Sequence, residues 1–335
     1  TEPFSLFVSV ALLKFDCKCI DVEFLYYMLM SPLVQAQATE NTRGVGNKNW
    51  VLDAIASTMV VLPPLVEQKR IVAKIEELLP YVDRYAAAYE KLEQFNAKFP
   101  EDMKKSILQY AIQGKLVEQR EEEGTGEELY RQIQAEKKRL IKEGKIKKEK
   151  PLPEIAEDEI PFDIPESWKW VRIGALTYNW GQKTPDSRFC YIDVGSVNNT
   201  SHTLNKENTV VEAKDASSRA KKIVKKGDVI FATIRPYLKN ICIIDKNFPC
   251  EPIASTAFAV MHCPEGLLNK YLYYYLLSPT FMRFANARDK AKGVAYPAIG
   301  EKDFFNGIIA LPPVAEQKRI VAKLEEILPL CERLK

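Results

Sequence analysis

Residues Leu62–Pro80, LPPLVEQKRIVAKIEELLP, occur a second time as Leu311–Pro329, LPPVAEQKRIVAKLEEILP. The two stretches start 249 residues apart and are identical at 15 of 19 positions. A shorter match precedes each copy: LYYMLMSP at Leu25–Pro32 and LYYYLLSP at Leu272–Pro279. This period is too long for a solenoid and fits a whole unit, one globular domain followed by one helix. The sequence therefore predicts two units that carry out one kind of task twice.

The composition is that of an ordinary globular protein, with 46% hydrophobic and 28% charged residues in 335 positions, enough for two or three domains. No apolar run reaches the ~18–20 residues that span a bilayer. The first residues lack a basic n-region and a cleavage site, so we expect no signal peptide and a cytoplasmic location. Seven scattered cysteines favour a reducing compartment. Only His202 and His262 are present, so histidine-based catalysis and metal binding are not expected.

A long helix is predicted from Pro64 onward. Its apolar residues recur at alternating steps of mostly four and three, the spacing of a coiled-coil seam: Ile71, Ile75, Leu78, Val82, Tyr85, Tyr89, Leu92, Phe95 and Phe99. Pro80 is expected to kink or locally break this helix. Phe99–Asp102 resembles a stop and restart, and the second part should end near Gly114. A second seam follows Pro312 and runs to the last residues.

The rest of the chain predicts one complete α+β domain. Thr125 and Glu128 form a capping box for a helix through Leu140, and a proline-rich linker follows. Strands are expected at Val171–Ile173, Cys190–Val194, Asp228–Ile234 and Ile241–Asp245, and helices at Asn269–Leu277 and Pro279–Asn286. We therefore divide the chain into the C-terminal part of a first domain (1–61), a central helical region (62–150), a second domain (151–310) and the start of a second long helix (311–335).

Several catalytic signatures are absent. Neither G-x-G-x-x-G nor G-x-x-x-x-G-K-[ST] occurs, which argues against nucleotide binding through a glycine loop. Leu62–Pro64 and Leu311–Pro313 superficially resemble the [ND]PP[YFW] loop of amino-methyltransferases, but they lack its polar and aromatic residues. No array of histidines, cysteines or carboxylates suggests a nuclease or metal site. We expect a chain without an active site of its own.

The strongest binding signal is Ala220–Asn240, AKKIVKKGDVIFATIRPYLKN. Arginine can bind guanine with two hydrogen bonds, and lysine or tyrosine can reach a phosphate. Composition alone favours a plainer interpretation, in which the lysines are a solvated face and Arg235 forms a structural ion pair. The polar loop Gln182–Arg188 fits entry into a groove, although polar loops are usually only solvated, and Lys292–Tyr296 is a second loop with basic and aromatic character. The tryptophans Trp168, Trp170 and Trp180 are expected to pack in a core.

The doubled LPP-x-x-EQKRIVAK-[IL]-EE motif resembles the specificity subunit of type I restriction–modification enzymes. Further matches are Ile112–Val117 (IQGKLV), Ile164–Trp170 (IPESWKW), Lys226–Ile230 (KGDVI) and Tyr296–Ile299 (YPAI), so the resemblance covers essentially the whole chain. Only about 24 residues precede Leu25, against about 110 in the second domain, so we expect the first recognition domain to be N-terminally truncated.

The resemblance implies two target-recognition domains with mixed or antiparallel sheets, each reading half of a split DNA sequence. It also implies long antiparallel coiled-coil helices that set the spacer and dock two methyltransferase subunits, with restriction motor-nuclease subunits joining the complex. The resemblance further implies that the subunit itself is non-catalytic and binds no cofactor. S-adenosylmethionine, ATP and Mg²⁺ belong to its partners, whose complex is an adenine-N6 DNA methyltransferase and an ATP-dependent endonuclease.

Eleven residues are predicted to contact DNA. The stronger candidates are Arg219, Lys221, Lys222, Arg235, Tyr237 and Lys239, and the weaker ones are Gln182, Lys183, Arg188, Lys292 and Tyr296. A different class of function stays open at this point, a coiled-coil scaffold whose globular domains bind protein.

Overall fold

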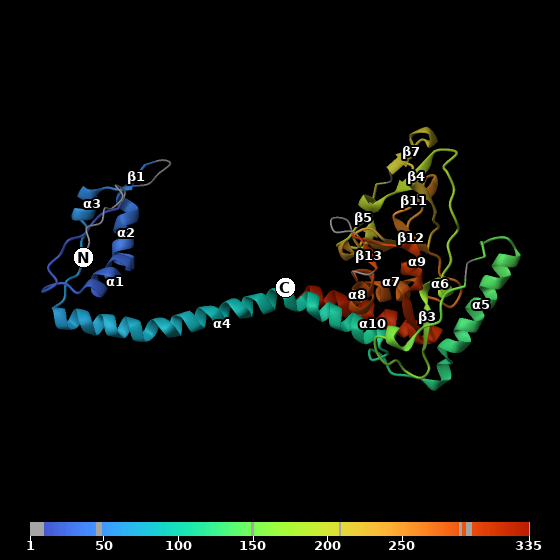
Figure 1. Cartoon of the computed structure of the whole chain (residues 1–335), viewed down its shortest axis with the longest axis horizontal. Helices are drawn as coiled ribbons and strands as arrows, with labels where there is room; N and C mark the ends of the chain where they lie inside the picture. Colours follow the sequence, from blue (N-terminus) through green and yellow to red (C-terminus); the bar gives the residue numbers. More distant parts are fainter. Residues whose placement is uncertain are drawn as a thin grey trace. The chain divides into compact units, whose positions relative to one another are not determined.

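The computed structural model describes residues 10–44, 49–148, 151–207, 209–287, 290–292 and 297–334, with the backbone alone for 291–292. The chain divides into two compact units, Thr1–Phe95 and Asn96–Lys335. Helix α4, Leu65–Ile112, contains the boundary between them. The elements are labelled in Figure 1.

The first unit consists of short elements ahead of α4. They are α1 (Val22–Met30), α2 (Pro32–Asn41), β1 (Thr42–Arg43), β2 (Asn49–Trp50) and α3 (Leu52–Ala56), with β1 and β2 antiparallel. The Asp21 carboxylate accepts a hydrogen bond from the Phe24 backbone N–H at 3.1 Å, and Pro32 begins α2. Residues 4–9 of the apolar run Phe4–Leu13 lie outside the described residues, and residues 10–13 are not in a strand.

Helix α4 corrects one prediction. It runs without interruption through Pro80 and Pro100, so the local break and the restart predicted there were wrong. Each proline removes one backbone donor, and the surrounding leucines, glutamates, lysines and alanines are strong helix formers. Pro100 is also buried by packing. The predicted end is confirmed, because α4 stops at Ile112 and Gly114 follows with φ +71°, a left-handed conformation that favours glycine.

Helix α5 (Gly126–Lys142) is the predicted capped helix. The Thr125 hydroxyl accepts from the Glu128 N–H at 3.2 Å, and the Glu128 carboxylate accepts from the Thr125 N–H at 3.2 Å. After the linker come β3 (Lys169–Arg172) and α6 (Ile173–Leu176). Single 3₁₀ turns occur at Glu121–Glu123 (η1), Glu157–Glu159 (η2), Val194–Ser196 (η3), Ala213–Asp215 (η4) and Pro236–Leu238 (η5).

The second unit has one antiparallel and one mixed sheet of three or more strands. Strands β10 (Ile241–Ile243), β9 (Val229–Ala232) and β12 (Phe258–Met261) form an antiparallel sheet in that order. A second sheet has the order β7 (Thr209–Val211), β4 (Phe189–Ile192), β11 (Glu251–Ser255) and β8 (Ala220–Ile223), with only β4 and β11 parallel. Three two-stranded antiparallel pairs complete the unit: β3 with β15 (Ile308–Leu311), β5 (Val197–Asn198) with β6 (Thr203–Leu204), and β13 (Ala291–Lys292) with β14 (Ala298–Ile299).

The main core lies where helices cover β9 and β12. The helices are α7 (Asn269–Leu277), α8 (Pro279–Ala285), α9 (Glu301–Asn306), α10 (Val314–Glu332) and the last turns of α4. Phe231, Phe281 and Phe304 meet at its centre with ring centroids 5.1–5.7 Å apart. Trp168 is buried in this core as predicted, while Trp170 and Trp180 are only half-buried. The α+β class, the four strand positions and the helices α7 and α8 are confirmed.

The repeated motif performs the same packing task in both units. Gln68 and Gln317 are fully buried at equivalent positions. The Gln317 amide accepts from the Leu268 N–H (2.9 Å) and donates to the carbonyls of Gly266 and Pro312 (3.2 and 3.1 Å). The Gln68 amide accepts from the Asp21 N–H (2.8 Å) and donates to the carbonyls of Cys19 and Pro63 (2.9 and 2.8 Å). Each glutamine therefore ties the start of a long helix to the loop before the preceding tyrosine-rich or methionine-rich helix.

Within the second unit, α10 lies along the end of α4. Lys104 of α4 forms an ion pair with Glu332 at 3.0 Å, and Gln119, which follows α4, donates to Glu316 at 2.6 Å. Lys104 therefore contacts the end of α10, whereas Gln119, later in the chain, contacts its beginning. The two helices run antiparallel over this stretch (Figure 1).

Candidate nucleic-acid interface

The loop Thr233–Asn240 carries three of the predicted DNA contacts. Arg235 and Lys239 both have left-handed backbone conformations, with φ +49° and +53°, on either side of the 3₁₀ turn Pro236–Leu238. A non-glycine residue in this region costs free energy and persists only where the surroundings hold it. The loop therefore has a fixed and unusual shape rather than a relaxed one.

Four hydrogen bonds hold this loop at its base. The Thr233 N–H and hydroxyl both donate to the Ala257 carbonyl, at 2.8 and 2.9 Å. The Arg235 N–H donates to the Pro297 carbonyl at 2.7 Å, and the Ile299 N–H donates to the Thr233 carbonyl at 3.0 Å. These bonds fasten the loop to the β11–β12 turn and to the segment that leads into β14.

The polar side chains of this loop are suited to a polar partner. The Tyr237 side chain is 53% exposed, and Arg235 and Lys239 are half-buried. The Lys239 ammonium lies 3.6 Å from a Glu101 carboxylate oxygen on α4. A rigid loop that offers an arginine, a lysine and a tyrosine hydroxyl can donate hydrogen bonds to bases or phosphates.

A second group of candidates lies along the edge strand β8. Arg219 is exposed at its start and Lys221 is half-buried. Gln182 forms an antiparallel bridge with Lys222, and the Lys183 N–H donates to the Lys221 carbonyl at 2.8 Å. The polar loop 182–188 therefore lies beside β8, which the sequence alone did not predict.

Lys222 does not belong to this surface, which corrects a prediction. Its side chain is 5% exposed and its ammonium is 2.5 Å from a Glu301 carboxylate oxygen. Successive residues of a strand point to opposite faces, so Lys221 and Lys222 cannot share one role. Strand alternation was the signal that could have separated the two lysines.

The remaining predicted DNA contacts differ in their exposure and in their ion pairs. Arg188 is exposed. The Lys183 ammonium contacts Glu251 at 2.9 Å and Asp186 at 3.1 Å, and its hydrogen bond to Glu251 raises the pKa of the lysine. The side chain of Lys292 and the whole of Tyr296 lie outside the described residues.

The two groups of candidates meet at the turn between β11 and β12. The Thr256 N–H donates to the Arg219 carbonyl at 2.8 Å, one residue from the Ala257 carbonyl that holds the Thr233 loop. Glu301, bound to Lys222, closely follows β14, whose Ala298 forms an antiparallel bridge with Ile234. The backbone thus brings the Thr233 loop and the β8 edge together into one candidate interface.

Sequence reasoning missed one feature near this surface. The Lys225 ammonium lies over the Trp180 ring, 3.4 Å from its centroid, a cation–π contact. Lys225 was part of the basic run but was not selected. Trp180 follows α6 far earlier in the chain, so no local pattern indicated this contact.

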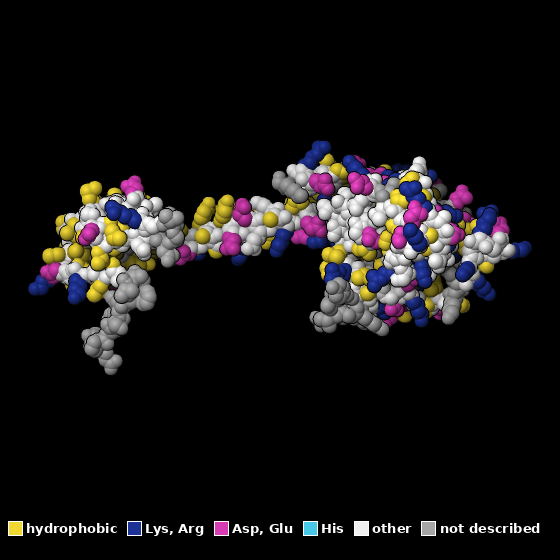
Figure 2. Space-filling model, turned by 90° about the horizontal axis from the view of Figure 1, so that it is seen from above, with side chains coloured by type: hydrophobic (Ala, Val, Ile, Leu, Met, Phe, Trp, Pro, Cys, Tyr) yellow, Lys and Arg dark blue, Asp and Glu magenta, His cyan; other side chains and the backbone are white. Residues whose placement is uncertain are grey.

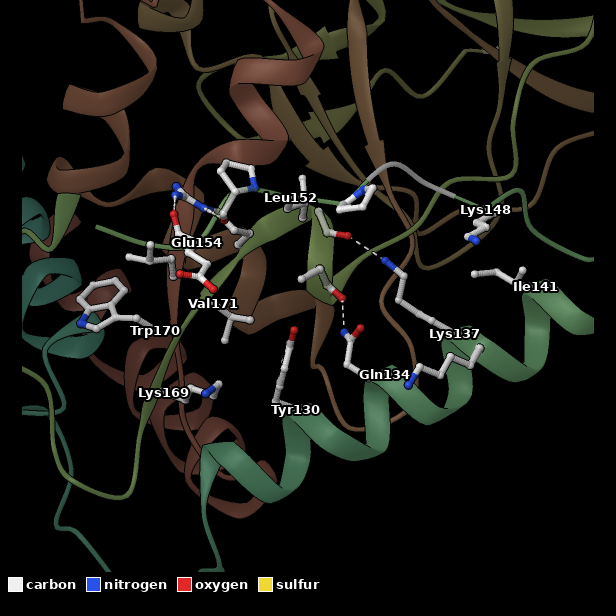
Figure 3. Close-up of a pocket in the computed structure, with 17 residues that line it drawn as sticks. Tyr130, Gln134, Lys137, Ile141, Lys148, Leu152, Glu154, Lys169, Trp170 and Val171 are labelled. Carbon is white, nitrogen blue, oxygen red and sulfur yellow. Dashed lines mark hydrogen bonds between the residues drawn. The ribbon is translucent and has the colours of Figure 1, made fainter. Parts of the chain in front are cut away.

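A cavity of about 570 Å³ lies between α5, the linker after it and β3, and Figure 3 shows its lining. Lys137 donates to the carbonyls of Gly174 and Thr177, both at 2.7 Å, and Gln134 donates to Ala175 at 2.8 Å. Arg172 holds Glu159 with two hydrogen bonds of 2.6 and 2.8 Å, which lower the pKa of that carboxyl. These polar groups bind the protein itself, so they act as a joint between linker and domain.

The described ranges show neither a metal-binding cluster nor a membrane-spanning helix. No group of three or more histidine, cysteine, aspartate and glutamate residues in them is arranged to hold a metal ion. No helix formed by them is both long and apolar enough to cross a membrane.

Comparison with known proteins matches residues 2–94 and 165–333 to the family of type I restriction–modification DNA specificity domains. The chain belongs to this family. The two matched ranges each contain one copy of the repeated motif, so the family relationship holds for both units.

Two curated relatives come from Escherichia coli. The EcoAI type I restriction enzyme specificity subunit is 27% identical over 94% of this chain and 61% of its own length. The EcoEI specificity subunit is 29% identical over 70% of this chain and 41% of its own length. The chain thus spans about three-fifths of the first relative and two-fifths of the second.

Among solved structures, the HsdS subunit from Thermoanaerobacter tengcongensis is 31% identical, with a TM-score of 0.44 over 52% of this chain and 45% of that one. A chain from a type I restriction–modification complex is 34% identical, with a TM-score of 0.46 over 51% and 44%.

Proposed function

We propose that this chain is the sequence-specific DNA-binding subunit of a type I restriction–modification complex, acting in the cytoplasm. The second unit reads one half of a split target through the Thr233 loop and the β8 edge. The observation that carries the proposal is the coincidence of family membership with a rigid loop displaying Arg235, Tyr237 and Lys239. Arg219 and Lys221 extend the positive surface toward the DNA backbone.

The long helix supplies the spacer and the docking face. At about 1.5 Å per residue, the 48 residues of α4 are roughly 72 Å long. Its apolar seam is largely exposed, at Leu78, Val82, Tyr85, Tyr89, Leu92, Phe95 and Phe99, and Figure 2 shows hydrophobic side chains along it. An apolar stripe of this length is characteristic of an interaction surface. We assign it to a second helical segment and to two methyltransferase subunits.

The chemistry belongs to the partners. In this proposal the methyltransferase subunits bind S-adenosylmethionine, and restriction motor-nuclease subunits bind ATP and Mg²⁺. In this proposal the chain itself provides the DNA-sequence specificity and sets the length of the spacer. A coiled-coil scaffold that binds only protein is the competing function, and the basic loop of fixed shape favours the DNA-binding alternative.

A salt titration separates the two functions. The chain is assembled with its methyltransferase subunits, and binding to duplex DNA is measured between 50 and 200 mM salt. Contacts with about six phosphates should weaken binding by about 10³-fold over this range, because neutralised phosphates release counterions. Absence of binding to any duplex would support the scaffold.

A further inference from the structure

Two cysteines of the second unit face each other across neighbouring strands. Cys190 lies in β4, and Cys250 lies where the chain bends into β11. Their sulfur atoms are 2.8 Å apart, although 60 residues separate them in the sequence. Both thiols are free, and no other two cysteine sulfurs among the described residues are in contact. This pair is therefore a product of the fold and not of a local motif.

The register of the sheet explains why the two sulfurs meet. β4 and β11 are parallel neighbours, with Cys190 opposite Pro252. Successive side chains of a strand alternate between its faces, so this alternation, continued through Glu251, puts Cys250 on the face of Cys190. On its other side β4 pairs with β7, where Val210 lies opposite Cys190. Strands on both sides of β4 therefore hold the Cys190 thiol in position.

The two thiols differ in their access to solvent. Cys190 is 1% exposed, and the cavity beside it holds only about 10 Å³, room for about one water molecule. Cys250 is half-buried, so a reagent from solution reaches its sulfur first. Burial raises the pKa of the Cys250 thiol to about 11. At neutral pH the pair is therefore a dithiol, which changes only when an oxidant reacts with its small thiolate fraction.

We infer that Cys190 and Cys250 form a reversible disulfide, a modification site that links β4 to β11 when a peroxide is present. Hydrogen peroxide oxidises the Cys250 thiol to a sulfenic acid: the O–O bond breaks, sulfur keeps one oxygen, and the other leaves as water. The Cys190 sulfur then attacks the Cys250 sulfur, the S–O bond breaks, and this oxygen leaves as a second water with the Cys190 proton. Two thiols and one peroxide thus give one disulfide and two waters.

The positions of the two sulfurs favour this step over reaction with a second molecule. A disulfide bond is about 2.0 Å long, so two sulfurs that are 2.8 Å apart need only a small approach. The bond would lie beside the polar loop 182–188, because the Lys183 ammonium contacts Glu251, the residue after Cys250, at 2.9 Å. It would fasten the end of this loop to β11. The inference does not depend on DNA binding.

Mass spectrometry of the full chain tests the site. The reduced chain is treated with hydrogen peroxide, the remaining thiols are alkylated, and tryptic peptides are analysed without reduction. We expect a cross-link between peptides 189–206 and 247–270, which a reducing thiol separates. Cys263 lies in the second peptide and is also half-buried, so it provides the matched control. Cys250→Ser should abolish the cross-link, whereas Cys263→Ser should keep it.

Thermal unfolding measures what the bond does to the second unit. A disulfide that closes a long stretch of chain restricts the unfolded state, so oxidation should raise the Tm by at least about 4 °C. Cys250→Ser should remove this rise, and Cys263→Ser should retain it. The comparison of the reduced and oxidised wild-type chain needs no substitution, so it also serves where a variant fails to fold.

Three results would overturn the inference. The first is the absence of the cross-link after oxidation of the folded chain. The second is an equal yield of the cross-link from the folded chain and from the chain unfolded in urea, because the fold would then not be what brings the thiols together. The third is an unchanged Tm after complete cross-linking, which would show that the bond does not fasten β4 to β11.

Discussion

The two copies of the repeated motif have almost the same sequence and different surroundings. Gln68 and Gln317 make equivalent sets of three hydrogen bonds, so the motif builds the same joint twice. Glu67 and Glu316 differ, because only Glu316 is covered by a tryptophan. In both copies the glutamine joins the motif to the loop before the preceding helix, whereas the tryptophan that binds Glu316 comes from a more distant part of the second unit.

The largest expected effect tests the shared part. Gln317→Ala should lower the free energy of unfolding of the second unit by about 2–4 kcal/mol, since it leaves buried backbone groups without partners. Gln68→Ala should loosen the first unit by a similar amount. Urea unfolding gives the first value, and amide exchange at Asp21, whose N–H binds Gln68, reports the second. A large loss of stability in one unit and none in the other would contradict the equivalence of Gln68 and Gln317.

Replacing the buried Glu316 should cost clearly more stability than replacing the exposed Glu67. Glu316→Ala leaves the buried indole N–H of Trp168 unpaired and should cost about 1–3 kcal/mol of stability. Glu67→Ala removes only an exposed ion pair and should change stability by less than about 0.5 kcal/mol. Parallel urea titrations of the two variants measure the difference. Similar costs for both would show that Trp168 is not what distinguishes the two copies.

The Thr233 loop belongs to the second unit, and replacing Arg235 tests its role in DNA recognition. Arg235→Ala should weaken binding to the cognate DNA by about 1–3 kcal/mol if the guanidinium contacts a base. Lys222→Ala serves as a contrast, because this buried, paired lysine should affect folding and leave the binding of folded protein nearly unchanged. Quantitative binding to cognate and scrambled duplexes distinguishes the two. Unchanged affinity and preference in Arg235→Ala would remove the loop from the interface.

The smallest effect concerns pH. Burial raises the pKa of Glu316 above its ordinary value of 4.5. A raised native pKa means that the folded chain holds this proton more tightly, so the stabilisation is present below pH 4.5 and declines as the pH rises through the native pKa. Relative to the wild-type chain, Glu316→Gln should therefore gain stability as the pH rises from 4.5. Urea titrations of both chains across that range measure this, with Glu67→Gln as the exposed control. A difference in stability between the two chains that stays constant over this pH range would contradict the raised pKa of Glu316.

Local patterns predicted the elements well and the contacts poorly. The capping box at Thr125, the tyrosine-rich helix and the strand before Arg235 all depend on neighbouring residues, and all are confirmed. The predicted local break at Pro80 and restart at Pro100 were wrong, because a single proline cannot show how strongly its surroundings favour a helix. The pairing of Lys222 with Glu301, 79 residues apart, depends on tertiary packing that no local pattern contains. The predicted domain boundaries and the predicted DNA contacts other than Lys222 stay predictions.

Methylation mapping with the assembled complex tests the central claim most directly. DNA modified by the complex with the unchanged chain is compared with DNA modified by complexes that carry Arg235→Ala or Tyr237→Ala. We predict a target of two half-sites with a fixed spacer, in which both substitutions alter or relax one half-site alone. Methylation of the same complete target by the variants, or changes spread over both half-sites, would contradict the assignment of one reader to the second unit.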